Sequence, residues 1–188
     1  DFVLNMKRGS PPRLAGHVNT MSARKNPGGL CHVKLRWSGL KDQHRAPIFA
    51  FGEHLANALE AQYGLVHPIW DLGEASQAYS EAGIVVFHEL QRFGPPGVAA
   101  LTVFGPHLVG LFGRERLLDA GVPANTTPWG GIALRLVENP QVASFADLQA
   151  AQSAVMNALA PAEVFAKTGD IEQAAGRNWV PIPQAALG

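Results

Sequence analysis

The chain has 188 residues, of which 47% are hydrophobic and 16% charged, a balance typical of a folded globular protein. Fifteen basic residues balance fifteen acidic ones, and zero net charge argues against a dedicated nucleic-acid-binding protein. No apolar run approaches the roughly 18 residues of a membrane span, and no secretory leader is recognisable. We therefore expect one cytoplasmic domain over residues 1–188. The first residue is Asp1 rather than Met, which fits a chain that lacks an N-terminal segment.

Strands and one helix are expected in the first seventy residues. The strands are predicted at Phe2–Leu4 and His17–Met21. A helix is predicted to begin at Pro47, because the missing N–H of proline is harmless in the first turn, and to stop at Gly64. Its apolar stripe consists of Ile48, Phe51, Leu55, Ala58 and Leu59. A short strand is expected at Leu65–Trp70.

Residues Cys31–Trp37 alternate between apolar side chains and basic ones. This period of two predicts an antiparallel strand with one solvated face. The apolar face consists of Val33, Leu35 and Trp37, and the opposite face of His32, Lys34 and Arg36. We therefore expect Trp37 in the core, and Lys34 and Arg36 in solvent or against an acidic partner surface.

The stretch Gly97–Val137 has the clearest pattern in the chain. It predicts a strand over Val98–Phe104, a break at Gly105-Pro106, and an apolar helix that carries the charged insert Arg114–Arg116. After a polar loop, a pair of glycines leads into a second strand over Ile132–Val137. The stretch contains no evident nucleophile, metal cluster or phosphate-binding loop, which points to a protein that acts through its surface.

A last helix is expected after Ser144. Ser144 occupies an N-cap position, and Asp147 three residues later completes the pattern of a capping box. Pro161 ends the apolar periodicity. The mixture of helices with an amphipathic strand predicts the α+β class, with a mostly antiparallel sheet and helices packed on one face.

Residues that could carry chemistry are scattered. The histidines stand at positions 17, 32, 44, 54, 67, 88 and 107, and no two have a spacing typical of metal ligands. Cys31 is the only cysteine, and we interpret it as an inert thiol. Glu53 with Glu60, or Asp71 with Glu74, could form a carboxylate pair, but a solvated helix face fits these residues better than an active site. We therefore expect no catalytic residue, metal or cofactor.

Two features of the central stretch are candidates for contact with another protein. Trp129 lies in a loop beside Pro128 and two glycines, where tryptophan is suited either to anchor an interface or to cover the core as a lid. The charged ridge Arg114–Arg116 lies between apolar helical turns and fits either a solvated face or a contact site. We predict partner contacts at Trp129, Arg114 and Arg116, and on the basic strand face at Lys34 and Arg36.

The order of these elements resembles that of type VI secretion immunity proteins. The similarity covers residues 1–160. In its second half it rests on the strand that ends at Thr102–Phe104, Gly105-Pro106, the sequence Gly113–Leu117 and Gly130-Gly131. Upstream, it rests on the strand Cys31–Trp37, the helix Pro47–Gly64 and the strand Leu65–Trp70. The resemblance implies a protein without catalytic residues that binds and neutralises a cognate secreted bacterial toxin.

Several functions are compatible with the sequence. The first is an immunity protein whose partner is a toxin, with no nucleic acid or membrane involved. The second is a small enzyme or ligand-binding domain whose site is not visible as a local motif, since many active sites have no such signature. The third is a structural subunit. The sequence does not specify whether the chain forms a homo-oligomer.

Overall fold

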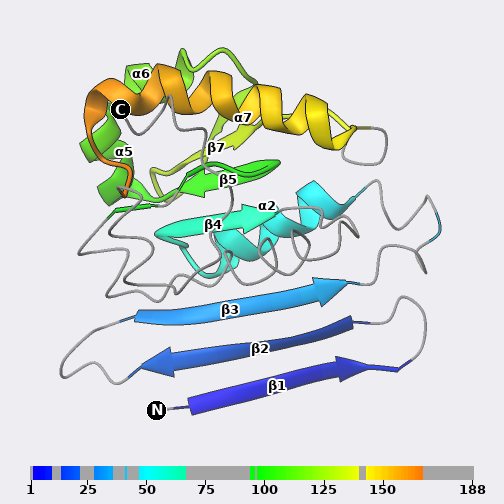
Figure 1. Cartoon of the computed structure of the whole chain (residues 1–188). Coiled ribbons are helices and arrows are strands. Elements are labelled where there is room, and N and C mark those ends of the chain that lie inside the picture. The colour runs from blue at the N-terminus through cyan, green and yellow to red at the C-terminus, as the bar shows by residue number, and fades with distance from the viewer. Residues whose placement is uncertain are drawn as a thin grey trace.

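The computed structural model describes residues 2–9, 14–21, 28–35, 41, 47–66, 94–95, 97–139 and 143–166. These residues contain two sheets that share no strand, together with helices that pack on the second sheet (Figure 1). Every strand pairing in both sheets is antiparallel. The α+β class and the antiparallel sheet expected from the sequence are therefore confirmed.

The first sheet has the strand order β1-β2-β3, with β1 at Phe2–Arg8, β2 at Leu14–Met21 and β3 at Gly28–Leu35. All three predicted strands exist, and the first two are longer than expected. Lys34 lies near the end of β3, whereas Arg36 and Trp37 lie outside the described residues.

The second sheet has the strand order β4-β5-β7-β6. Its strands are β4 at Tyr63–Val66, β5 at Leu101–Phe104, β6 at Ala124–Thr126 and β7 at Ile132–Arg135. The helices are α2 at Ile48–Ala58, α5 at Pro106–Phe112, α6 at Arg114–Leu118 and α7 at Phe145–Leu159, and a 3₁₀ turn follows at Ala160–Ala162. The short strand β6 lies in what the sequence predicted to be a loop.

Helices cover both faces of the second sheet (Figure 1). A Cβ added to Gly64 would lie 3.6 Å from the Cβ of Val103 and 3.9 Å from that of Ala56, which places α2 on the face of Val103. The next residue, Phe104, belongs to the opposite face and packs on Phe112 of α5, with ring centroids 5.1 Å apart. The expected packing on one face thus applies to α5 and its neighbours, while α2 lies on the other face.

The buried face of α2 differs from the predicted stripe. Phe51 and Leu59 were expected in the core, but they are 43% and 49% exposed. The buried positions are Ile48, Phe49 and Ala56. Gly52 lies on the same side, since a Cβ there would collide with Cγ2 of Val66. Around Gly52 the helix approaches the sheet so closely that a small residue is needed there, while Phe51 and Leu59 remain on the exposed side.

The ends of the helices show which local signals determined the fold. Ser144 and Asp147 form the predicted capping box, in which the Ser144 Oγ accepts from the Asp147 N–H at 3.1 Å. The Ser144 hydroxyl and the Ser144 N–H donate to the Asp147 carboxylate at 2.7 and 3.2 Å, and these two hydrogen bonds lower the pKa of Asp147. The helix α2 ends before Glu60, whose φ is +45°, and Gly64 lies within β4 rather than at the predicted helix stop. The single helix predicted through Arg114–Arg116 is broken at Gly113, which has a φ of +87°.

Two glycines of this region form a matched test of the bend between α5 and α6. A Cβ would meet no atom within 4 Å at either Gly110 or Gly113, but only Gly113 has a positive φ. We expect Gly113→Ala to lower the free energy of unfolding by about 1–2 kcal/mol, because an L-residue is strained there. Gly110→Ala should raise it by about 0.5–1 kcal/mol, because alanine favours a helix. Chemical denaturation measures both, and equal effects at the two positions would contradict the bend.

Candidate protein-binding surface

The strand β5 is preceded by an irregular segment, Gly97–Ala100. All four of its residues are buried. Side chains supply the hydrogen bonds that a regular strand would find in its neighbours. The Tyr63 hydroxyl donates to the Gly97 carbonyl at 2.8 Å, and the Gln152 amide donates to the Val98 carbonyl at 2.6 Å. Burial raises the pKa of Tyr63, so this hydroxyl keeps its proton and remains a donor.

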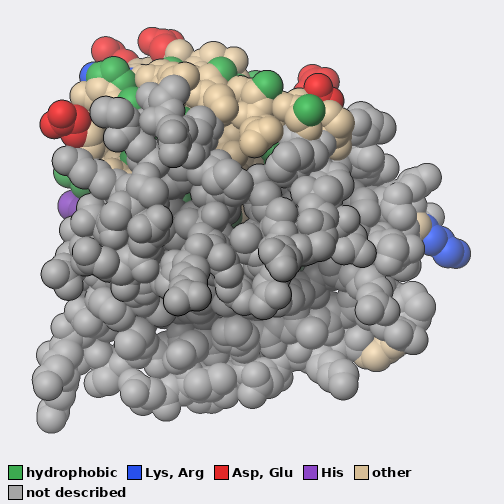
Figure 2. Space-filling model, in the orientation of Figure 1, with side chains coloured by type: hydrophobic (Ala, Val, Ile, Leu, Met, Phe, Trp, Pro, Cys, Tyr) green, Lys and Arg blue, Asp and Glu red, His purple; other side chains and the backbone are tan. Residues whose placement is uncertain are grey.

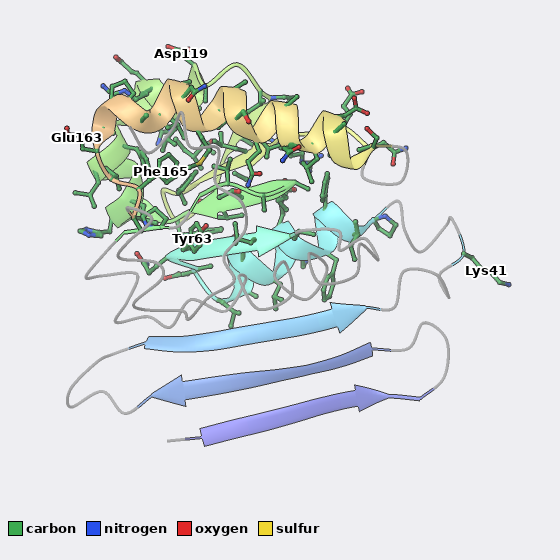
Figure 3. The ribbon with its side chains drawn as sticks, in the orientation of Figure 1. Lys41, Tyr63, Asp119, Glu163 and Phe165 are labelled. Carbon is green, nitrogen blue, oxygen red and sulfur yellow. The ribbon has the colours of Figure 1, made fainter. Side chains whose placement is uncertain are left out.

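The other half of this segment is bonded by one side chain and one backbone group. The Ala99 N–H donates to Oγ1 of Thr102 at 2.7 Å, and the Ala100 carbonyl accepts from the Leu136 N–H at 2.9 Å. Groups from β4, β5, α7 and the residue after β7 therefore converge on one short stretch of backbone (Figure 3 labels Tyr63). This fixes the start of β5 and, through it, the position of α5.

The loop of Trp129 is held against the first turn of α5. Thr127 closes the loop: its N–H donates to the Gly131 carbonyl at 2.9 Å, and its Oγ1 accepts from the Gly131 N–H at 2.7 Å. Gly130 has a φ of +93°, and a Cβ there would lie 3.6 Å from Cγ of Pro106. A well-defined loop thus presents Trp129 beside the N-terminal end of α5.

Trp129 itself is partly buried and packs against the core. Its indole Nε1 is buried and has no hydrogen-bond partner among the described residues. The ring therefore covers the core, as the lid interpretation requires, while part of the side chain stays accessible.

The two arginines of the charged ridge have different roles. Both are exposed, but the Arg116 guanidinium donates to the carbonyl of Phe112 at 2.8 Å. This bond satisfies a carbonyl in the last turn of α5, so Arg116 holds the bend between the two helices. Arg114 has no hydrogen bond or ion pair among the described residues.

Leu111 and Leu118 flank Arg114 and are 51% and 38% exposed. Arg114 and Leu118 are four residues apart and share a face of α6, while Leu111 lies in the last turn of α5. In Figure 2, acidic side chains are spread along the edge of the molecule that carries α6 and α7. The corner between α5 and α6 therefore combines two exposed apolar side chains with a cation that has no partner in the described part of the chain.

The predicted contacts are only partly brought together. The Trp129 loop lies at one end of α5 and Arg114 beyond its other end, which at 1.5 Å per residue is about 10 Å along the helix axis. Lys34 belongs to the separate first sheet, and Arg36 lies outside the described residues. We use the name α5–α6 corner for Leu111, Arg114, Arg116 and Leu118.

Two pairs of residues were not recognised from the sequence. Glu53 was considered only with Glu60, but its carboxylate receives two hydrogen bonds from Arg135 of β7, at 2.8 and 2.6 Å. This pairing raises the pKa of Arg135 and ties α2 to the sheet. His17 and His32 lie opposite each other in the register of β2 and β3. Spacing along the chain gives no sign of either pair, since both depend on how the elements are placed.

Some kinds of site can be checked directly within the described ranges. The side chains described there include no group of three or more potential metal ligands. No helix among them has the length and apolar character needed to cross a bilayer. Comparison of the chain with protein-family models, curated protein sequences and solved structures gives no significant match.

Two substitutions distinguish how much the packing of Trp129 and how much its indole N–H contribute to the free energy of unfolding. Trp129→Ala should lower the free energy of unfolding by about 2 kcal/mol, since it removes apolar area from the core. Trp129→Phe keeps most of that area and removes an N–H without a partner, so its cost should stay below about 1 kcal/mol. Thermal and chemical denaturation of both variants tests this. A phenylalanine variant as unstable as the alanine variant would show that the N–H is bonded.

Proposed function

We propose that the protein is an immunity protein, which binds a cognate secreted toxin of the type VI system and neutralises it by one-to-one inhibition. The observation that carries the proposal is the α5–α6 corner, where exposed Leu111 and Leu118 flank Arg114, which has no hydrogen bond or ion pair with another described residue. The order of elements in the sequence, which resembles that of the immunity family, supports the choice of a toxin as partner.

The corner has properties that favour binding to another protein. Arginine and tryptophan contribute strongly to the centres of protein interfaces, and exposed leucines add apolar area that a partner can bury. The corner is also fixed in advance, because Arg116 bonds to the last turn of α5 and Leu117 is buried in the core. A surface that is already ordered loses less conformational entropy when a partner binds. Zero net charge does not oppose such binding, since complementary local patches suffice.

Trp129 extends this surface at the other end of α5. Its loop is closed by Thr127 and packed on Pro106, so the accessible part of the ring has a defined position. A partner that covers both features would span the length of α5. The proposed contacts are therefore Trp129, Arg114 and the two exposed leucines, with Arg116 holding the geometry.

Co-expression with the toxin encoded by the neighbouring gene tests the proposal. The wild-type chain should restore growth of cells that produce the toxin, and it should co-purify with the toxin in a one-to-one complex. The double variant Leu111→Asp/Arg114→Glu should weaken toxin binding by at least about 100-fold, as expected when interface residues worth about 2 kcal/mol or more are replaced. Isothermal titration calorimetry measures the affinity.

The control is a double variant with the same change of net charge elsewhere. Leu59→Asp/Lys41→Glu alters a similarly exposed leucine at the C-terminal end of α2 and an exposed lysine, Lys41, which Figure 3 places far from α6. It should bind the toxin within about threefold of the wild type. Death of the cells despite wild-type expression would overturn the toxin as partner. Turnover of a substrate by the purified protein would instead favour the enzyme interpretation.

A further inference from the structure

The strand β6 forms one edge of the second sheet, because it pairs with β7 on one side only. Its burial decreases along the strand: Ala124 is half-buried, and Asn125 and Thr126 are exposed. The other edge strand, β4, is half-buried at every residue. Within the described part of the chain, β6 is therefore the edge of this sheet that is more open to another polypeptide.

Hydrogen bonds to β7 show which backbone groups of β6 point out of the sheet. The Pro123 carbonyl accepts from a β7 N–H at 3.0 Å, and the Thr127 N–H donates across the hairpin at 2.9 Å. In an antiparallel pair, residues alternate between those that exchange bonds with the neighbouring strand and those that do not. Asn125, midway between these two residues, therefore also faces β7. The N–H and carbonyl groups of Ala124 and Thr126 point to the free edge.

These outward groups of Ala124 and Thr126 have no hydrogen-bond partner among the described residues. Natural sheets protect such edges with charged side chains or with proline. No charged residue stands between Asp119 and Arg135. Pro123 lacks only an N–H that would point toward β7, so it leaves the outer side of the strand unprotected. The free edge can therefore accept another strand.

We propose that β6 pairs antiparallel with β6 of a second copy of this chain, around a two-fold axis that passes beside Asn125. This register sets Ala124 opposite Thr126 of the second copy, and the reverse pair follows from the symmetry. Each pair exchanges both of its N–H···O=C hydrogen bonds, so every outward group of the edge finds a partner. Asn125 lies opposite Asn125 of the second copy, and the two sheets become one.

The edge favours a second copy because it is its own complement. Its donors and acceptors are arranged symmetrically about Asn125, so the two-fold pair satisfies all of them. Such a contact places identical side chains close together, and the uncharged residues of this edge avoid the repulsion that like charges would cause. The helix α6 contacts both β6 and β7, and the axis keeps the two copies of α6 on one face of the joined sheet.

The small size of the edge determines how strong the association is. One short strand buries less than the roughly 1,200 Å² of a stable interface, so we expect a reversible dimer and not a permanent one. The inference is independent of the proposed function, since the second copy takes the place of any toxin at this edge.

Sedimentation equilibrium of the full chain, from about 10 µM to about 1 mM, measures the dissociation constant of the dimer. The weight-average mass should rise with concentration toward that of two chains. Thr126→Pro removes an outward N–H and leaves the bonds to β7, so it should raise the dissociation constant at least about tenfold. The matched control Thr126→Val keeps that N–H and should change the constant less than about twofold. Circular dichroism verifies that both variants keep the wild-type fold.

Cross-linking through cysteine tests the register. In the proposed pair the two Asn125 Cα atoms are about 4.5 Å apart, a distance that a disulfide can span. In a Cys31→Ser background, Asn125→Cys should therefore form a covalent dimer at least about tenfold faster than Ala158→Cys, which places a cysteine at an exposed position of α7.

Three results would overturn the proposal. They are a chain that stays monomeric at the highest concentration, a Thr126→Pro variant that dimerises like the wild type, and equal cross-linking at the two cysteine positions. Protection of the Thr126 amide from hydrogen exchange only in the presence of toxin would replace the second copy by a strand of the toxin. Rescue of growth by co-expression tests the proposed function separately and does not depend on these results.

Discussion

The second half of the fold depends on the hydrogen bonds that satisfy the buried backbone of Gly97–Ala100. A buried carbonyl without a donor costs about 1–3 kcal/mol, so an irregular segment in the core needs a partner for each polar group. Tyr63, Gln152 and the backbone of Leu136 provide donors for the carbonyls of Gly97, Val98 and Ala100, and Thr102 accepts from the N–H of Ala99. Because they come from separate elements, the segment fixes the relative positions of the strands and of α7.

The layers on both sides of the second sheet follow from this fixed centre. On one face, Gly52 allows α2 to approach β4, and the paired Glu53 and Arg135 join α2 to β7. On the other face, the rings of Phe104, Phe112 and Phe165 pack in sequence, with centroid separations of 5.1 and 4.9 Å. The α5–α6 corner and the Trp129 loop lie at the outer edge of this second face. Their positions are thus set by the core and not by contacts among themselves.

Signals confined to a few residues were sufficient to predict many elements. The capping box of Ser144 and Asp147, the proline at the start of α5 and the alternation over Cys31–Trp37 each act through their own turn or strand. The buried face of α2 could not be predicted in this way, because it depends on how closely Gly52 approaches the sheet. The irregular segment before β5 looked like strand, since its residues are apolar and the donors that bond it are far away in sequence.

In the candidate site, too, some features could be predicted from the sequence and others depend on the fold. Residue type alone indicated Trp129, Arg114 and Arg116, but only the structure shows that Arg116 bonds to α5 while Arg114 is free among the described residues. Leu111 and Leu118 fall in the apolar helix predicted from the sequence, and the structure shows that they are exposed on the two sides of the bend at Gly113. The opposition of His17 and His32 required the register of a hairpin. Exposure, hydrogen-bond partners and strand register depend on how distant elements are placed, so local sequence patterns did not predict them.

Two glutamines of α7 provide the most direct test of the central role of Gly97–Ala100. Gln152 is buried and donates to the Val98 carbonyl, whereas Gln149 is exposed on the same helix. Methionine keeps the length of either side chain and removes the amide. Denaturation by urea should show that Gln152→Met lowers the free energy of unfolding by about 1–3 kcal/mol. Gln149→Met should change it by less than about 0.5 kcal/mol, and equal effects of the two substitutions would contradict the account.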